Sequence, residues 1–176
     1  MQMTPNSELK LRPAEIADLL AICSIMRRPE VRKNQYWIND ARWHEFAEAT
    51  IRSEEASETK IDVIEVNGNV AGYVVTRRQV YRNHKHVYLS FNLQPELWGR
   101  GLMNNALKTC ITDLFLDGQT EGAMVECFSG NHRCRRLLQK LAFESVPIPV
   151  VERLSCLVSR LPIRWVLRYW LSNPMS

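Results

Sequence analysis

A mixed α/β (α+β) fold is predicted for this chain of 176 residues, because strand-like and helix-like patterns follow one another along it. The clearest strand covers residues 86–93, where apolar and polar side chains alternate. Gly99 and Gly101 follow, and apolar residues then recur at helical spacing over residues 104–115. A glycine turn that leads into a helix gathers free N–H groups at the positive end of the helix dipole, so this segment predicts a phosphate site.

The remaining elements are predicted in chain order from the same patterns. Asn67-Gly68 is a strong signal for a type I′ turn, so residues 61–66 and 70–77 predict a β-hairpin. A polar connection is expected over residues 81–85. Further strands are expected at residues 10–12 and 123–128. A first helix is expected at residues 14–26, and Pro29 should end it. Two more helices are expected at residues 41–54, with Asp40 as the N-cap, and at residues 133–141, with Asn131 as the N-cap.

The C-terminal segment from residue 145 is less regular, because prolines interrupt its apolar runs at residues 150–158 and 163–171. A final sheet strand is the preferred interpretation of the second run. The alternative is a basic amphipathic helix whose aromatic side chains face a partner or a membrane surface.

Length and composition indicate one domain over residues 9–176, preceded by a disordered terminus over residues 1–8. The five cysteines are odd in number and lack paired metal spacing, so we expect reduced thiols in a cytoplasmic protein without a metal. No apolar stretch is long enough to span a membrane. The net charge of +4 is explained by a solvated surface, so neither a nucleic-acid nor a membrane partner is expected. Both a monomer and a homodimer fit these observations.

Two motifs make the prediction more specific. Trp98-Gly99-Arg100-Gly101, together with Asn131-His132-Arg133-Cys134 and the helix that ends in Leu141-Ala142-Phe143, resembles the GNAT superfamily of N-acetyltransferases. Within it, residues 9–145 are most similar to the branch that acetylates ribosomal-protein N-termini (RimJ/RimL-like). The resemblance implies the GNAT fold, with a mixed, mostly antiparallel central sheet of six to seven strands flanked by about four helices.

The same resemblance implies that acetyl moves from acetyl-CoA to a primary amine, either a protein N-terminus or a small amine, by direct attack in a ternary complex. The chain departs from the family pattern at several positions. These are Glu96 in place of Gln or Arg, Cys134 in place of Ser, Ala142 in place of Gly, Asn105 in place of Glu, and Tyr88 in place of Glu. The alternative function is therefore a GNAT-fold module that binds CoA or a partner with little catalysis.

For the cofactor, the resemblance implies that backbone N–H groups from Trp98 to Leu102 hold the pyrophosphate, with added charge from Arg100. It also implies that the strand ending at Asn92 and Leu93 splays from its neighbour, so that its backbone pairs with the pantetheine arm. The alternatives are an ordinary strand-to-helix turn at the glycines and an ordinary ladder in the strand. The predicted cofactor-binding residues are Asn92, Leu93, Trp98, Gly99, Arg100, Gly101, Leu102 and Asn131.

Asn131 and Cys134 are one helical turn apart, so one helix face presents both to the cofactor. By resemblance, Asn131 binds near the thioester and Cys134 takes the place of the serine that protonates the leaving thiolate. The alternatives are a simple N-cap for Asn131 and a small buried side chain for Cys134.

The general base has several candidates. His86 and Tyr88 share the polar face of the strand at residues 86–93, which we expect to open on the substrate side of the cleft. His86 titrates near neutrality and can accept a proton through water. Glu126, on the neighbouring strand, is the carboxylate alternative, and Leu138 occupies the position where other GNAT branches place a tyrosine acid.

Overall fold

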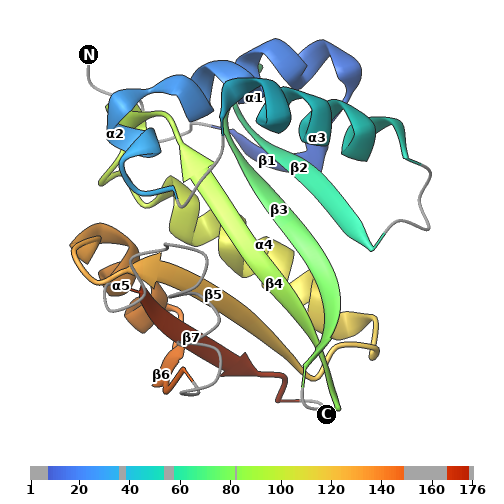
Figure 1. Ribbon diagram of the computed structural model, residues 1–176, viewed down its shortest axis with the longest axis vertical. Helices are drawn as coiled ribbons and strands as arrows, with labels where there is room; N and C mark the ends of the chain where they lie inside the picture. The colour runs from blue at the N-terminus through green and yellow to red at the C-terminus, as the bar shows by residue number, and fades with distance from the viewer. Residues whose placement is uncertain (1–7, 36–38, 54–57, 82, 149–165, 175–176) are drawn as a thin grey trace.

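One sheet of seven strands organises the computed structural model, which describes residues 8–35, 39–53, 58–81, 83–148 and 166–174 (Figure 1). The strand order is β1-β2-β3-β4-β5-β7-β6, and only β4 and β5 pair in parallel. Five α-helices and two short 3-10 helices flank the sheet within these described ranges. The predicted fold, mixed and mostly antiparallel, is confirmed.

The strands are β1 (Leu9–Pro13), β2 (Thr59–Val66), β3 (Asn69–Tyr81), β4 (His84–Leu93), β5 (Gly122–Phe128), β6 (Glu144–Val146) and β7 (Val166–Ser172). The helices are η1 (Ile16–Asp18), α1 (Leu19–Arg27), α2 (Pro29–Arg32), α3 (Asp40–Arg52), η2 (Pro95–Leu97), α4 (Leu102–Leu116) and α5 (His132–Lys140).

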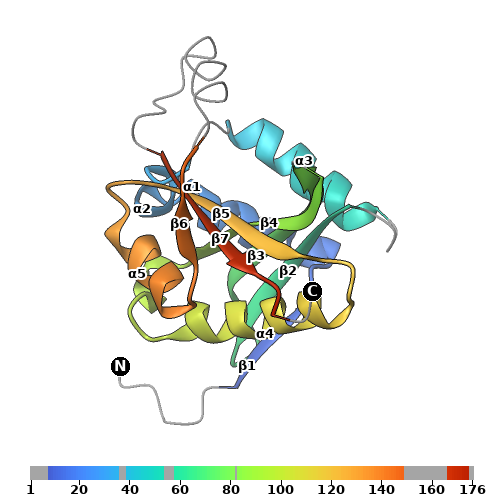
Figure 2. The ribbon, with the colours of Figure 1, turned by 90° about the horizontal axis from the view of Figure 1, so that it is seen from below.

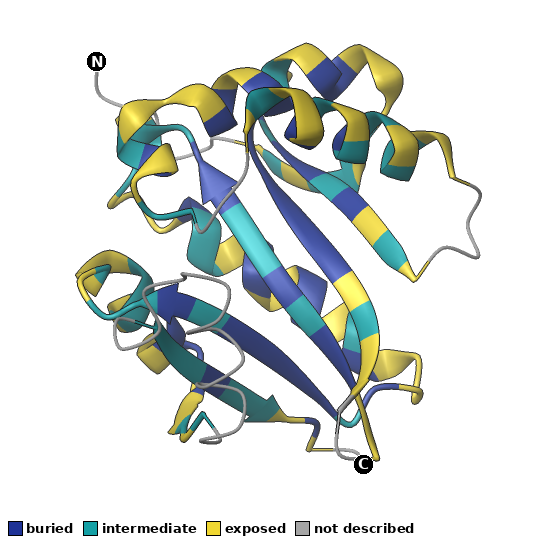
Figure 3. Cartoon of the chain, viewed as in Figure 1, coloured by how far each residue is buried: buried dark blue, intermediate teal, exposed yellow. Residues whose placement is uncertain are grey.

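The helices lie on both faces of the sheet, with α4 and α5 on one side and α1 to α3 on the other (Figure 2). On the first side, Leu107 of α4 and Leu138 of α5 are fully buried against strand residues such as Val87. On the second side, Ile22 of α1 packs in the cluster that contains Tyr73 of β3. Buried positions therefore run along the strands and the inner helix faces (Figure 3), as expected for a sheet enclosed by two apolar cores.

Several predicted elements are present, although their boundaries differ from the prediction. Asn67 and Gly68 both have positive φ, as the predicted hairpin turn requires. The helix after the glycine turn begins earlier than predicted, because Gly101 with φ 78° is its N-cap. Pro29 ends α1, but it also opens the short helix α2, where its missing N–H costs no helical hydrogen bond.

Three predictions about local structure were wrong. Asn39, not Asp40, caps α3, because its side chain accepts a hydrogen bond from the Arg42 N–H at 2.9 Å. The helix predicted over residues 14–26 is divided into η1 and α1. The polar connection predicted over residues 81–85 is largely strand, because β3 and β4 pair as far as Tyr81 and His84.

The preferred interpretation of the last apolar run is confirmed, since Val166–Ser172 forms β7 between β5 and β6. The helical alternative is wrong for these residues. The run at residues 150–158 lies outside the described residues.

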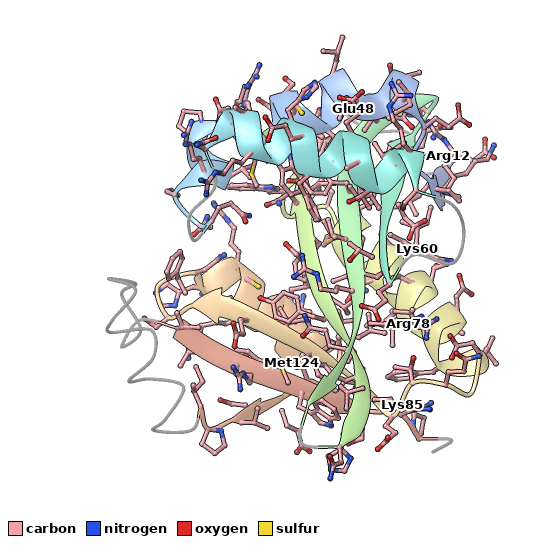
Figure 4. All side chains as sticks on the ribbon, turned by 45° about the vertical axis from the view of Figure 1, so that its right-hand side comes forward. Arg12, Glu48, Lys60, Arg78, Lys85 and Met124 are labelled. Carbon is pink, nitrogen blue, oxygen red and sulfur yellow. The ribbon has the colours of Figure 1, made fainter. Side chains whose placement is uncertain are left out.

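The contact between β4 and β5 is short. Only His86, Val87 and Tyr88 pair with β5, opposite residues 122–124, and the remainder of β4 diverges from it (Figure 1). Lys85 and Met124, which are labelled in Figure 4, lie at this paired end of the two strands. The predicted splaying of β4 from its neighbour is therefore confirmed.

An ionic cluster joins the first strand to the first helix and to β2. The Arg12 guanidinium donates to both carboxylate oxygens of Asp18, at 2.7 and 3.0 Å, and to Glu65 at 2.9 Å. Asp18 is only 7% exposed and also accepts from the Glu15 N–H at 2.8 Å. The hydrogen bonds from Arg12 lower the pKa of Asp18.

We expect Asp18→Asn to lower the free energy of unfolding at pH 7 by about 1–3 kcal/mol, because an amide cannot match the charge of Arg12. The pKa of Asp18 is depressed in the folded protein, so this contribution is present above the unfolded pKa of about 3.9 and is lost as the pH falls through the folded pKa. Urea unfolding at several pH values measures the difference, which should shrink in acid.

Glu48→Gln is the matched control. It removes an exposed pair with Arg52 on α3 and should cost no more than about 0.5 kcal/mol. An Asp18→Asn difference that stays constant down to acid pH would contradict the prediction.

Candidate active site

A cleft of about 820 Å³ lies where β4 and β5 diverge. Its walls are the open part of β4, the facing part of β5, the glycine loop before α4, and one face of α5. Residues 33–35, which follow α2, add a further wall. The cleft thus brings together segments that are far apart in the sequence.

Beyond Tyr88, the edge of β4 that faces the cleft has no strand of the described residues beside it. The Gln94 N–H donates to the Ala71 carbonyl at 2.8 Å, on the side of β3. Because hydrogen-bonding directions alternate along a strand, the N–H groups of Phe91 and Leu93 point the other way, toward the cleft. The Leu93 carbonyl accepts from Trp98 Nε1 at 2.8 Å, which is consistent with this direction.

Asn92 is placed differently from Leu93. Its backbone is turned toward β3, opposite Tyr73, by the same alternation. Its side chain accepts from Gln35 Nε2 at 2.8 Å and donates to the Tyr73 hydroxyl at 2.9 Å. Asn92 therefore fastens residues 33–35 of the cleft wall to the sheet, a role that its position in the strand did not predict.

The glycine loop opens onto the cleft. Gly99 and Gly101 both have φ 78°, and both line the cleft with Trp98 and Leu102. Gly101 caps α4, so the first N–H groups of this 15-residue helix point into the opening. Arg100 is exposed and is not among the lining residues, so the structure does not place its side chain with the rest of the loop.

A row of basic residues on α5 lines the cleft and was missed by the sequence reasoning. It consists of Arg133, Arg136 and Lys140, which share one helix face by their spacing. The Arg133 guanidinium lies 4.8 Å from the centre of the Trp98 ring, a cation–π contact that joins α5 to the glycine loop. The recurrence of basic residues at helical spacing was the signal that could have identified this row.

Asn131 and Cys134 both line the cleft at the start of α5. The Asn131 side chain accepts from the Cys134 N–H at 3.2 Å, so Asn131 is an N-cap of the helix as well as a cleft residue. Cys127, a β5 residue that the sequence reasoning did not single out, also lines the cleft. The Cys127 thiol and burial raise the pKa of Cys134, while the Cys134 thiol lowers the pKa of Cys127.

Two of the three residues considered for the general base line the cleft. Glu126 accepts from Arg168 Nε at 2.7 Å, a pair of directly opposed residues on β5 and β7. Tyr88 is half-buried, and burial, with a smaller effect of Glu126, raises the pKa of its phenol. Tyr88 is therefore a neutral hydrogen-bonding group at pH 7.

The prediction that His86 opens on the cleft was wrong. His86 is 2% exposed and lies outside the lining residues, at the end of β4 that is closed by β5. Its ring is 5.7 Å from the Trp170 ring, and burial lowers its pKa. The polar face of the strand is thus covered at this end, and His86 has a packing role.

No group of three or more His, Cys, Asp or Glu in the described part of the chain is arranged to hold a metal ion. Among the described helices, none combines the length and the apolar character that crossing a membrane requires.

Comparison with known proteins decides the family. A family model described as "Acetyltransferase (GNAT) domain" matches residues 8–144. The chain belongs to the GNAT acetyltransferase family. A search of curated protein sequences gives no match to this acetyltransferase.

Solved structures resemble this GNAT protein over nearly its whole length. A RimL ribosomal L7/L12 α-N-protein acetyltransferase has a TM-score of 0.75 at 14% identity, over 96% of each chain, and was solved with coenzyme A in disulfide linkage to a cysteine. A Salmonella typhimurium acetyltransferase that modifies the N-terminal serine of ribosomal protein L7/L12 has a TM-score of 0.71 at 13% identity, over 93% of this chain and 94% of that chain. A mutant of the Vibrio cholerae spermidine N-acetyltransferase SpeG has a TM-score of 0.70 at 17% identity, over 94% of each. At identities this low, the TM-scores show a shared fold alone.

Proposed function

We propose that acetyl-CoA occupies the cleft between β4 and β5 and that a protein or peptide N-terminus is the amine acceptor. The observation that carries this proposal is the divergence of the two strands directly beside the glycine loop. An extended chain with a phosphate at one end fits such a groove. The open strand edge offers N–H groups to the extended chain, and the helix N-terminus offers N–H groups to the phosphate.

Each part of the cofactor meets suitable groups. The pyrophosphate fits the N–H groups at Leu102 and the following residues of α4, with positive charge from the Arg133, Arg136 and Lys140 row. The pantetheine amides fit the open edge at Phe91 and Leu93. This order places the thioester in the part of the cleft that Tyr88, Glu126 and Cys134 line.

The transfer step needs a polarised carbonyl and a proton for the leaving sulfur. The amine nitrogen attacks the thioester carbon, whose oxygen fits the Leu93 N–H, and the carbon–sulfur bond then breaks. Cys134 gives its proton to the departing thiolate, a role that suits a thiol whose raised pKa keeps it protonated at pH 7. Glu126 with Arg168 orients the acceptor, whose ammonium loses one proton to water before the attack. The second proton, lost as the amide forms, restores the Cys134 thiol.

The charges in the cleft favour an acceptor with a single amine. Glu126 is the one carboxylate among the described lining residues, and it is already paired with Arg168. Once the phosphates of acetyl-CoA occupy the basic row, the further ammonium groups of a polyamine still find no unpaired carboxylate among these residues, whereas a peptide N-terminus brings one charge only.

The test of this function is release of free CoA from acetyl-CoA with two classes of acceptor. Short peptides with free N-termini should react at least about tenfold faster than spermidine at equal concentration, because one unfavourable charge contact of roughly 1.4 kcal/mol gives that ratio. Peptides with an acetylated N-terminus are the control. Faster turnover of spermidine would overturn the acceptor class, and binding of acetyl-CoA without turnover of any amine would favour the binding module.

The cofactor position is tested by Gly101→Val. A side chain at this residue should block the approach of the phosphates to the α4 N-terminus and weaken acetyl-CoA binding about tenfold or more in calorimetry. Gly118→Val is the matched control, because Gly118 also has positive φ and open space around it but does not line the cleft. Equal affinities of the two folded variants would contradict the assignment.

The proton donor is tested by replacing Cys134. Cys134→Ala should lower turnover about ten- to ten-thousand-fold, up to the range of general acid catalysis, with little change in acetyl-CoA affinity. Cys134→Ser should retain more activity, because a hydroxyl also carries a proton. Cys110→Ala, which removes a buried thiol in α4 outside the cleft, is the control. Normal turnover of Cys134→Ala would leave Cys134 with a packing role alone.

A further inference from the structure

The side chains of β4 and β5 divide the cleft between the two faces of the sheet. Val125 of β5 packs in the core that contains α4, so its neighbour Glu126 points to the other face. On β4, Asn92 lies opposite Tyr73, which packs against α1 and α3. Tyr88, four positions before Asn92, shares that face. The proposed phosphate site is at the α4 N-terminus, so an acceptor that meets Glu126 enters from the face that carries α1 to α3.

A hydrogen-bonded wall closes the cleft on this same face, next to α2 and the end of β4 (Figure 1). The Gln35 side chain donates from Nε2 to the Asn92 side chain at 2.8 Å, and Asn92 donates to the Tyr73 hydroxyl at 2.9 Å. Tyr73 is fully buried. Asn34 donates from Nδ2 to a backbone carbonyl of α2 at 3.0 Å. The segment after α2 is therefore anchored to both the sheet and the helix, and Lys33 directly precedes the two anchored residues.

Lys33 is exposed and lines the cleft from this wall. The neighbouring arginines are paired, Arg32 with Asp40 at 3.1 Å and Arg28 with Glu96. In the part of the chain that the structure describes, no carboxylate lies within ion-pair distance of Lys33. Lys33 is also the one basic residue outside α5 among the described lining residues. The face from which the acceptor enters thus carries a positive charge that neither these residues nor the proposed phosphate position balances.

We propose that Lys33 binds a carboxylate of the acceptor, so that the preferred acceptors are peptide or protein N-termini with acidic side chains directly after the first residue. This inference rests on the proposed function, because it takes the acceptor to be a peptide whose amine reaches Glu126. The amine then meets Glu126 with Arg168, and the following side chains meet Lys33. The flexible stem of a lysine lets its ammonium follow a carboxylate at either the second or the third position. Complementary charges of this kind select partners and speed association, so the effect belongs in kcat/KM.

The experiment compares peptides that begin with serine, continue with two glutamates, two glutamines or two lysines, and are otherwise identical. Release of free CoA at saturating acetyl-CoA gives kcat/KM for each. Wild type should use the glutamate peptide about threefold or more faster than the glutamine peptide, and the lysine peptide most slowly. Lys33→Gln should remove most of this preference, and Lys33→Glu should reverse the order of the glutamate and lysine peptides. Calorimetry should give Lys33→Gln the wild-type affinity for acetyl-CoA.

Lys108→Gln is the matched control, because Lys108 is exposed on α4 and does not line the cleft, and it should keep the wild-type preference. Equal use of the three peptides by wild type, or a preference that both Lys33 variants retain, would overturn the proposal and leave peptide acetylation intact. Weaker binding of acetyl-CoA by Lys33→Gln would also overturn it, because Lys33 would then belong to the phosphate site. If acetyl-CoA binds and no peptide reacts, the proposed function fails and this proposal fails with it.

Discussion

The short parallel contact between β4 and β5 is the constraint on which the rest of the molecule depends. The two strands pair over His86 to Tyr88 and then separate, so one sheet contains both a closed end and an open end. At the closed end, Gly122 has no side chain, and the Trp170 ring occupies the space that a Cβ would need. At the open end, the N-termini of α4 and α5 reach the gap. One end of this pair of strands is therefore packed core, and the other end forms the cleft.

This separation explains which parts of the site the sequence could predict. The alternation over residues 86–93 identified the strand, and the glycine turn with Asn131 and Cys134 identified residues that line the cleft, because these signals are local. Local alternation does not say where β5 stops pairing with β4. His86 and Tyr88 therefore looked equivalent, although only Tyr88, the last residue of the paired end, lines the cleft. The position of β7 depends on pairs such as Glu126 with Arg168, which are 42 residues apart and leave no local signal.

The sequence did not predict the contacts that hold the cleft wall at residues 33–35 either. Asn92 looked like one more polar residue of an alternating strand. In the fold it bridges Gln35 and the buried hydroxyl of Tyr73, so its side chain links the segment after α2 to the middle of the sheet. Residues 33–35 of the cleft wall are thus held by a side chain of β4, while the backbone of the next residue, Leu93, is directed to the cleft.

The presence of Cys127 and Cys134 in one cleft follows from the same geometry. A short turn separates β5 from α5, in which the Asn131 N–H donates to the Phe128 carbonyl at 2.9 Å and Asn131 then caps the helix. This turn brings a residue near the end of the strand beside the first turn of the helix, although seven positions separate the two cysteines. Cys127 therefore lines the same cleft as Cys134, the thiol proposed as the proton donor, although no local sequence pattern connects the two residues.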